Sequence, residues 1–261
     1  MIQLICCLVT FCACILGTIC GMGGGIVIKP VLDATGVMSV ATITFLSGCT
    51  VVAMTCWNVG KNLIKRESVL ELRTTIILAV GATLGGFLGK ELFNQVAAQF
   101  ADQNTAGGVQ AILLLLATFA TLIYTMRKDR IATKQVESRL VGLVLGVVLG
   151  VLGSFLGIGG GPFNVALLSY FFSMPTKKAT QNSLLIVLFS QLTSTVKTIA
   201  AGAPDFDPTI LVGMILLAIL GSEVGRRINK KIDNRQATLC LEGAMVLIMA
   251  INVYNAVKFL G

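Results

Sequence analysis

Gly21-Met22-Gly23-Gly24-Gly25 is the stretch that decides the fold of this chain, and a second copy, Gly157-Ile158-Gly159-Gly160-Gly161, follows 136 residues later. Each copy follows a long apolar run and precedes a much shorter one. Two distant glycine pairs share this offset: Gly85 with Gly221, and Gly89 with Gly225. Matches at one fixed offset indicate an internal duplication. We therefore expect two related halves, each built on an apolar segment that glycines interrupt.

The composition is typical of a protein that lies in a lipid bilayer. Hydrophobic residues make up 55% of the 261 residues and charged residues only 12%, with a mean hydropathy of +0.88. A soluble domain carries about 25% charged residues, so this chain cannot cover itself with a water-facing surface. The net charge of +8 lies in connectors without interleaved aromatic residues, which argues against a nucleic-acid partner. We expect a multi-pass protein of the cell membrane.

Several kinds of chemistry are excluded by the residues that are missing. The sequence contains no histidine and neither a CxxC pair nor a GxSxG motif. Histidine-based nucleophile activation and histidine metal sites therefore have no bases or ligands to work with. The eight cysteines lie mostly in apolar runs and are expected to be small packing residues, with a metal or redox role as the alternative. We expect no enzymatic activity, no metal site and no bound cofactor.

Eight apolar segments are long enough to cross about 30 Å of hydrocarbon, which needs roughly 20 residues in a helix. We expect them at about 2–21, 40–58, 69–90, 108–126, 140–157, 178–201, 209–226 and 237–258. Two short apolar segments, 26–36 and 162–173, directly follow the glycine stretches. As helices they rise only about 16–18 Å, so neither can cross the bilayer alone.

The basic residues decide where the short segments end. Four groups hold 16 of the 20 lysines and arginines: 58–73, 127–139, 177–178 and 226–235. Cytoplasmic loops carry an excess of basic residues, so these groups should share the cytoplasmic face. They do so only if each short segment forms a hairpin with the long segment before it and returns to the side from which the chain came.

Hairpins at both glycine stretches make the two halves inverted copies, as in many secondary transporters. The predicted fold class is an all-α polytopic membrane protein with two inverted repeats, each of four long helices and a glycine-broken hairpin limb. We expect residues 1–126 to form the first repeat, 127–139 a basic cytoplasmic connector, and 140–261 the second repeat. Both termini should then lie outside.

The glycine stretches predict an anion site. A helix that begins directly after a break has unbonded amides in its first turn, and its N-terminal end attracts negative charge. Two such ends can face one cavity when the repeats are inverted. Close helix packing alone is the alternative role for these glycines. The expected backbone donors are Gly23, Gly24, Gly25, Gly159, Gly160 and Gly161.

Polar side chains near the breaks would complete this site. Their amide and hydroxyl groups are hard to satisfy in lipid, although some could instead bond to neighbouring helices. The expected side-chain contacts are Thr44, Ser47, Asn164, Gln181, Asn182 and Gln191, with Lys29 as an added positive charge.

Other charged residues have ordinary explanations in the sequence. Lys197 is close to the end of its segment and is expected to extend toward a membrane interface. Glu223 is three and four residues before Arg226 and Arg227, so we expect ion pairs along the helix. Asp33, near the end of the first short segment, is expected at an interface.

The duplicated GxGGG pattern with its short apolar limb resembles the sulfite exporter TauE/SafE family of permeases. The segment Thr180-Gln181-Asn182-Ser183-Leu184-Leu185 is similar to the one that follows the glycines there, and the resemblance covers essentially the whole chain. It implies a secondary permease for a small sulfur-containing anion: sulfite, thiosulfate, or an organosulfonate such as sulfoacetate. Ile43-Thr44-Phe45-Leu46 matches the second-half segment only loosely, so the two half-sites are expected to be unequal.

The residues leave several alternatives open. An anion channel or a permease for another small carboxylate or oxyanion would fit the same features. Carbonyl groups at the broken helices could hold a coupling Na⁺, and coupling to H⁺ is equally open. The exact substrate, the direction of transport and the oligomeric state do not follow from the sequence.

Overall fold

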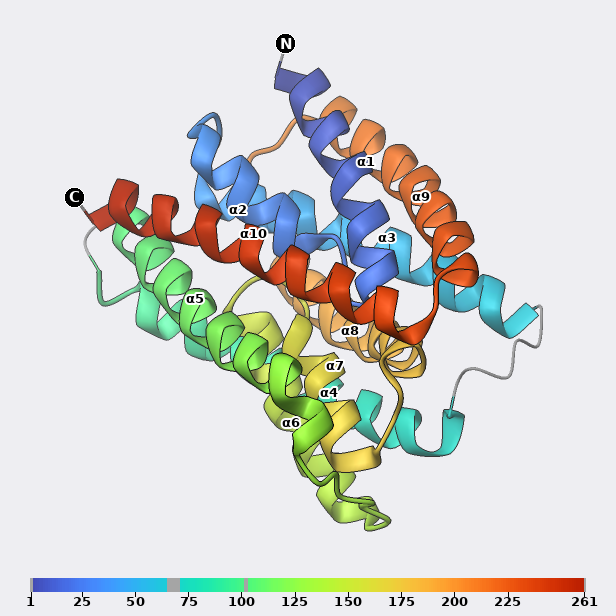
Figure 1. The fold of residues 1–261 in the computed structure, drawn as a ribbon. Helices are drawn as coiled ribbons and strands as arrows, with labels where there is room; N and C mark the ends of the chain where they lie inside the picture. The colour runs from blue at the N-terminus through green and yellow to red at the C-terminus, as the bar shows by residue number, and fades with distance from the viewer. Residues whose placement is uncertain (1, 65–70, 101–102, 261) are drawn as a thin grey trace.

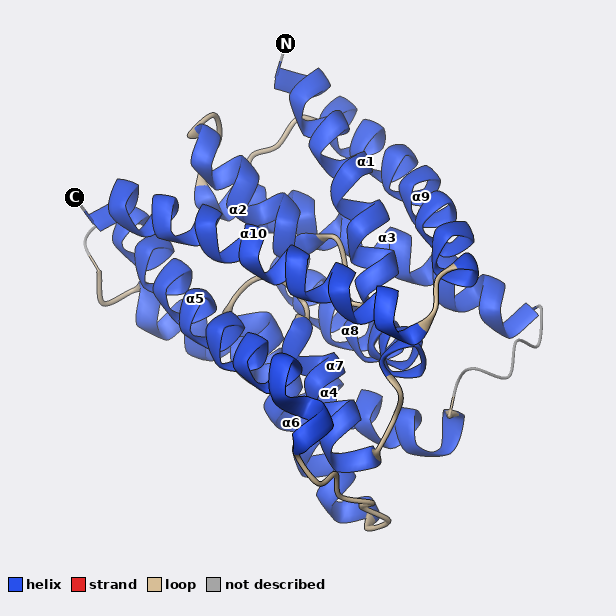
Figure 2. Cartoon of the chain, viewed as in Figure 1, coloured by secondary structure: helices blue, strands red, loops and turns tan. Residues whose placement is uncertain are grey.

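The computed structural model describes residues 2–64, 71–100 and 103–260, so Lys65, Arg66 and Asp102 lie outside the described residues. Within these ranges the chain forms ten α-helices, one short 3₁₀ helix at Lys128–Arg130 and no strand (Figures 1 and 2). The predicted all-α fold class is therefore confirmed. The helices are α1 (Ile2–Cys20), α2 (Gly25–Thr35), α3 (Val40–Ile64), α4 (Leu72–Ala97), α5 (Gln103–Arg127), α6 (Arg139–Phe155), α7 (Pro162–Phe172), α8 (Thr176–Ala200), α9 (Pro208–Lys231) and α10 (Asn234–Leu260).

Seven helices in the described part of the chain are long and apolar enough to cross a membrane, one fewer than expected. The difference is α6, which has 17 residues and rises about 26 Å. The two limbs α2 and α7 have 11 residues each, as expected for segments that do not cross the bilayer alone.

Both interruptions are tight turns with left-handed glycines at equivalent positions, but they differ one residue later, where φ is −65° at Gly24 and 158° at Gly160. The glycines with left-handed backbone (φ 68–72°) are Gly21 and Gly23 in the first turn and Gly157 and Gly159 in the second. Glycine adopts this conformation without steric cost. In the first glycine turn (21–25) the Met22 amide donates to Gly17 O at 3.0 Å, and in the second (157–161) the Ile158 amide donates to Gly153 O at 3.1 Å.

The two halves exchange equivalent contacts. A Cβ added to Gly85 on α4 would lie 2.1 Å from Val147 O on α6, and a Cβ added to Gly221 on α9 would lie 2.6 Å from Phe11 O on α1. Gly221 and Val147 are the positions 136 residues after Gly85 and Phe11. Helix α4 of the first half thus packs on α6 of the second, while α9 of the second packs on α1 of the first. The halves are interlocked rather than separate.

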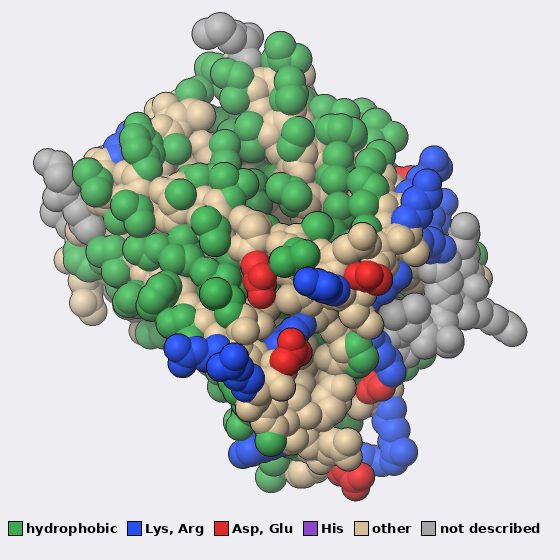
Figure 3. All heavy atoms as spheres, in the orientation of Figure 1, with side chains coloured by type: hydrophobic (Ala, Val, Ile, Leu, Met, Phe, Trp, Pro, Cys, Tyr) green, Lys and Arg blue, Asp and Glu red, His purple; other side chains and the backbone are tan. Residues whose placement is uncertain are grey.

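Three of the basic segments meet at one end of the molecule. Lys128 Nζ donates to Thr176 Oγ1 at 2.6 Å and to Thr238 Oγ1 at 2.7 Å, and Lys177 Nζ donates to Ile232 O at 2.8 Å. Figure 3 shows Lys and Arg side chains gathered over the lower half and right edge of the view. We call this end, formed by residues 127–139, 176–178 and 226–238, the basic face. The predicted grouping of these segments on one face agrees with the contacts.

The opposite face holds the loops with few basic residues. Ile2, Met38 and Asp205 line one surface pocket there, and Thr42 Oγ1 donates to Asp205 O at 3.0 Å. The start of α1, the end of the α2 limb and the α8–α9 loop therefore lie together, near the N-terminus in Figure 1. Helix α2 begins inside the molecule and returns to the face where α1 begins, which is the expected hairpin.

Candidate anion site at the glycine turns

The two glycine turns lie against each other at the centre of the molecule. A Cβ added to Gly25 would lie 3.1 Å from Ile158 O, so the start of α2 touches the second turn. Val187 of α8 lies beside both turns, because its methyl groups are 3.1 Å from an added Gly23 Cβ and 2.4 Å from an added Gly160 Cβ. The two glycine turns, 136 residues apart in the sequence, are therefore in direct contact.

Some of the expected backbone donors are free and others are occupied. The Gly24 amide donates to Met54 Sδ at 3.2 Å, and the Gly159 amide donates to Gly153 O at 2.9 Å. The remaining expected amides have no hydrogen-bond partner among the residues that the structure describes: Gly23, Gly25, Gly160 and Gly161.

Four buried side chains around the turns carry polar atoms without a partner in the described structure. We call this group the central polar cluster; its unpartnered atoms are Ser47 Oγ, Asn164 Oδ1, Gln191 Oε1 and Thr195 Oγ1. Buried polar groups in native proteins are nearly always hydrogen-bonded, and leaving one unsatisfied costs about 1–3 kcal/mol. Several such atoms in one place indicate a site where a bound molecule or water supplies the missing bonds.

Gln191 is the centre of this cluster. Its Nε2 lies 2.6 Å and Thr195 Oγ1 lies 3.1 Å from a Cβ added to Gly48, and its Oε1 lies 2.3 Å from a Cβ added to Gly159. The carboxamide therefore fills the space between α3 and the second glycine turn. A Cβ at either position would displace the carboxamide from this place.

Asn164 and Ser47 approach the turns in the same way. Asn164 Nδ2 lies 2.7 Å from a Cβ added to Gly160, and Ser47 Oγ lies 3.2 Å from a Cβ added to Gly25. Neither Asn164 nor Gln191 makes a side-chain hydrogen bond to the described residues, so both NH₂ groups can donate to a bound anion.

Gln181 and Asn182, also expected at this site, lie elsewhere. Gln181 Oε1 accepts from Asn62 Nδ2 at 2.9 Å, and Asn182 Oδ1 accepts from Thr75 Oγ1 at 2.7 Å. They precede Gln191 on α8 by nine or ten residues, a rise of about 15 Å. The structure therefore uses these two amides to join α8 to α3 and α4, near the basic face.

Thr44 and Lys29 lie at the second turn, but their polar atoms are bonded. Thr44 Oγ1 donates to Val40 O at 2.7 Å, while its methyl group lies 3.1 Å from a Cβ added to Gly157. Lys29 Nζ pairs with Asp33 Oδ2 at 2.7 Å, and both side chains are at most 5% exposed. The Lys29 charge is thus balanced, and the Asp33 side chain is buried in the last turn of α2, close to the opposite face where an interfacial position was expected.

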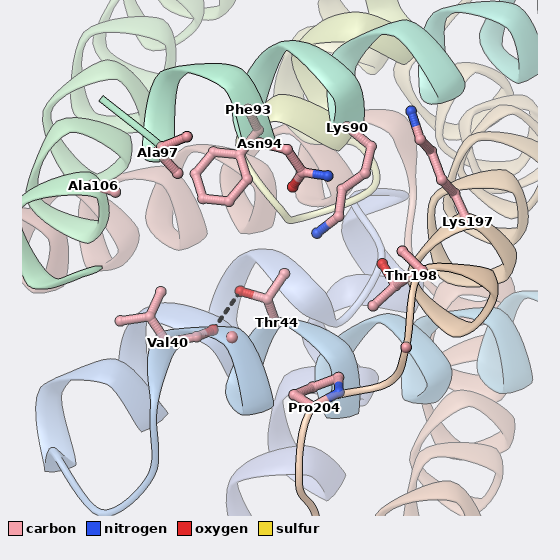
Figure 4. A pocket seen from close by; sticks show the side chains of 14 residues that line it. Val40, Thr44, Lys90, Phe93, Asn94, Ala97, Ala106, Lys197, Thr198 and Pro204 are labelled. Carbon is pink, nitrogen blue, oxygen red and sulfur yellow. Dashed lines mark hydrogen bonds between the residues drawn. The ribbon is translucent and has the colours of Figure 1, made fainter. Parts of the chain in front are cut away.

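A pocket of about 430 Å³ lies between α3, α4 and α8 beside the central polar cluster. We call it the vestibule; Figure 4 shows its lining, which includes Thr44, Lys90, Phe93, Asn94, Lys197 and Thr198. The Lys90 ammonium points into this pocket (Figure 4), and no carboxylate among the described residues pairs with it. Lys197 turns toward α4, where its Nζ pairs with Glu91 Oε2 at 2.6 Å. The pocket therefore holds an unbalanced positive charge.

The vestibule leads toward the central polar cluster along two helices. Thr44 precedes Ser47 by one turn of α3, and Thr198 follows Thr195 by one turn of α8, each a rise of about 5 Å. The loops that border the vestibule, at Ala98 and Ala201–Pro204, belong to the opposite face. An anion entering from that face would meet Lys90 first and the cluster next.

The remaining charged residues behave largely as expected. Glu223 Oε1 pairs with Arg226 Nη2 at 2.9 Å and with Arg227 Nε at 3.2 Å, so the predicted ion pairs are confirmed. Lys197 was expected to reach an interface; its ammonium lies near the loops of the opposite face but is held by Glu91 and by the Phe87 ring, 3.8 Å from the centroid.

The surroundings of the two glycine turns are unequal. In the first half the positions equivalent to Asn164, Gln191 and Thr195 are Ile28, Thr55 and Val59. Two of these are apolar, and Thr55 Oγ1 donates to Val51 O within its own helix at 2.6 Å. The second turn therefore has the two carboxamides, Asn164 and Gln191, beside it, whereas the first turn has only the Ser47 hydroxyl.

Lys90 and Thr195 were missed by sequence reasoning. Thr195 follows Gln191 by four residues and so shares its helix face, a signal that could have been used. Lys90 ends the expected segment 69–90 on the side with few basic residues, which also set it apart. No group of three His, Cys, Asp or Glu side chains within the described ranges could hold a metal ion.

Comparisons with known proteins agree with this architecture. The model of the sulfite exporter TauE/SafE family matches residues 6–253. The chain is 25% identical over 263 residues to the probable membrane transporter protein YunE of Bacillus subtilis (strain 168), covering 92% of this chain and 93% of the relative. It is 23% identical over 188 residues to the probable membrane transporter protein YdhB of the same organism, covering 71% and 73%. No solved structure matches the chain. With nearly its whole length matched by the family model, the chain belongs to the sulfite exporter TauE/SafE family of multi-pass membrane transporters.

Proposed function

We propose that this protein is a secondary transporter that carries a small sulfur-containing anion by alternating access. The observation that carries the proposal is the central polar cluster: four buried polar side chains without partners, placed at two glycine turns below a positively charged vestibule. Family membership supports a sulfur oxyanion or organosulfonate as the class of substrate.

The chemistry of the cluster suits an oxyanion. Sulfite, thiosulfate and sulfonates present hydrogen-bond acceptors, and the donors of the site are the Ser47 and Thr195 hydroxyls, the Asn164 and Gln191 NH₂ groups and the glycine amides. The carboxamide oxygens, Asn164 Oδ1 and Gln191 Oε1, are acceptors and would bond to water beside the anion. Helix α7 begins at Pro162 directly after the second turn, so its positive dipole end faces the same place. Lys90 would attract the anion without binding it bidentately, because an ammonium acts as a point charge.

The arrangement of the faces suggests how the site opens. The basic face is cytoplasmic by the positive-inside rule, which makes the vestibule an entrance from the outside and the two halves inverted repeats. The interlocked pairs α4–α6 and α1–α9 would move against the glycine turns and close the vestibule while a path opens toward the basic face. Such rocking requires two alternative packing arrangements of the helices. The glycines at the α4–α6 and α1–α9 contacts allow this, because they present no side chains that would have to pass each other.

Counterflow in proteoliposomes tests this function. Vesicles loaded with unlabelled sulfite, thiosulfate or sulfoacetate are diluted into a trace of the same ³⁵S-labelled anion. A carrier gives a transient accumulation of label above equilibrium with at least one of the three anions, and an excess of acetate does not prevent it. A channel gives only equilibration. Absence of accumulation with all three anions would rule out the proposed carrier.

A further inference from the structure

We propose that Asp33 is the proton-binding site that couples anion movement to a proton gradient, and that it acts through Lys29. This inference rests on the proposed anion transport and names its coupling ion. It arises from a buried ion pair whose position was not foreseen: Lys29 and Asp33 are paired at 2.7 Å on α2, inside the protein.

Asp33 borders a surface pocket, although its carboxylate is buried. It lines a surface pocket of about 320 Å³ on the opposite face, together with Gly36 and Lys258. It also lines a cavity of about 10 Å³, shared with Lys29 and Gln110, which is about the space that one water needs. Asp33 Oδ1 is buried and has no partner in the described structure. A proton from the surface pocket can therefore reach an acceptor that is otherwise unused.

The pair is connected to the second glycine turn by two contacts. Lys29 Cε lies 3.2 Å from a Cβ added to Gly157, so the lysine side chain runs along the turn. Gln110 Nε2 donates to Phe155 O at 2.7 Å, at the end of α6, while its Oε1 lacks a described partner. A change in the charge of Asp33 therefore alters the electrostatic potential at the second glycine turn, next to the proposed anion site.

Charge balance then links the two ligands. With Asp33 ionised, the Lys29 ammonium is neutralised and adds little to anion binding. When Oδ1 takes up one proton, the carboxyl group becomes neutral and the ammonium is left unbalanced beside the second turn, where an anion can balance it. By reciprocity, a bound anion favours protonation by the same factor. The proton and the anion therefore bind together and leave together, and the proton returns to water on the other side.

The other charged groups around Asp33 strengthen this coupling. On α10, Lys258 Nζ donates to Ala34 O at 2.9 Å and lies 3.4 Å from Asp33 O. On α4, Lys90 lines the vestibule together with Thr44, whose methyl group lies beside the position of a Cβ added to Gly157, as Lys29 Cε does. Helix α1 carries no charged residue, α3 has only Lys61 near its other end, and α5 contributes the uncharged Gln110. These cations give the surroundings of the pair an excess of positive charge that a bound anion can balance, and the ammonium beside the carboxylate disfavours Na⁺.

The test compares wild type with Asp33→Asn, which is permanently neutral, in the same proteoliposomes. The probe is whichever of the three anions shows counterflow. Two readouts are taken: uptake with an acid-outside gradient relative to no gradient, and internal acidification by a trapped pH dye when the anion enters. We expect the gradient to raise wild-type uptake at least about fivefold. In Asp33→Asn, counterflow remains while gradient stimulation and anion-driven acidification are both lost.

Two control variants keep the outcomes distinct. Asp207→Asn changes an exposed acid of the opposite face. Hydrogen bonds from the Thr209 hydroxyl and amide hold the pKa of Asp207 below its ordinary value, so this acid is ionised throughout the experiment. The variant should therefore behave as wild type. The double variant Lys29→Met, Asp33→Asn removes both charges and reports loss of coupling if Asp33→Asn alone does not fold. Protonation of the anion itself affects all variants equally.

Gradient stimulation that persists in Asp33→Asn, or stimulation by Na⁺ in place of protons, would overturn the coupling proposal while leaving anion transport intact. Absence of counterflow in wild type would instead remove the proposed function.

Discussion

Asn164 and Gln191 are buried carboxamides whose side chains make no hydrogen bond to the described residues. Their burial therefore destabilises the fold, and no described contact offsets that cost. We expect Asn164→Leu, or Gln191→Met, to lower the initial rate of anion counterflow at least about tenfold, equivalent to about 1.4 kcal/mol of binding. The thermal unfolding midpoint in detergent should stay unchanged or rise, because no hydrogen bond is lost.

Gln181→Leu is the matched comparison on the same helix. Gln181 Oε1 accepts from Asn62 Nδ2 and Gln181 Nε2 donates to Asn229 Oδ1, so the change removes one bond from each of two buried amides and should cost about 1–3 kcal/mol of stability. A fall in the unfolding midpoint for Asn164→Leu would contradict the assignment of Asn164 to anion binding. An unchanged midpoint for Gln181→Leu would contradict the assignment of Gln181 to hydrogen bonds between helices.

The glycines of the second turn should tolerate no side chain. In Gly159→Ala the new methyl group would lie 2.3 Å from Gln191 Oε1, and φ of 72° adds about 1–2 kcal/mol of backbone strain. We expect counterflow to be lost. Gly243→Ala on α10 is the control, since an added Cβ there meets nothing within 4 Å, and it should transport as wild type; equal activity of the two variants would speak against the site.

At the scale of helices, hydropathy predicted the elements well because lipid-facing runs are long and uninterrupted. Their ends were less certain: α9 was expected to stop at 226 and continues to Lys231. Helical hydrogen bonding does not depend on the lipid boundary, so charged residues such as Lys230 extend the helix into water. Glycine turns were predictable because the local sequence alone requires them.

Which face of a helix meets which neighbour could not be predicted. Helix α8 carries buried polar residues along its whole length, and sequence gives no reason to place Gln191 at the turn and Gln181 against α3. Only the packing of α3, α4 and α8 separates them. Asp33 shows the same limit, because its burial depends on α5 and α10, which are distant in sequence.

The α4–α6 seam depends on the absence of side chains. We expect Gly85→Val to prevent the helices from meeting, because even a Cβ would lie 2.1 Å from Val147 O. The protein should then fail to elute as a single monodisperse species after detergent extraction. Leu84→Val, next to it on the exposed side of α4, should elute as wild type; normal elution of Gly85→Val would show that the seam can relax.

For the whole molecule, the hairpin topology predicts sidedness. Single cysteines replacing Thr133, Asn234 and Asp205 are introduced into a variant without its eight native cysteines. We expect Thr133→Cys and Asn234→Cys to react with an impermeant maleimide only from the cytoplasm, and Asp205→Cys only from outside. Labelling of Thr133→Cys and Asn234→Cys from different sides would be incompatible with the fold.

The exchange of partners between the halves has a consequence for biosynthesis. Helix α1 leaves the ribosome long before α9, and α4 leaves it before α6, the helices on which they pack. Until synthesis of the second half, their small-residue surfaces face lipid or the insertion machinery, and the first half cannot reach its final packing by itself. Nascent chains cut short before α9 should therefore be unstable and quickly degraded, whereas the two halves produced as separate polypeptides in one cell should find each other.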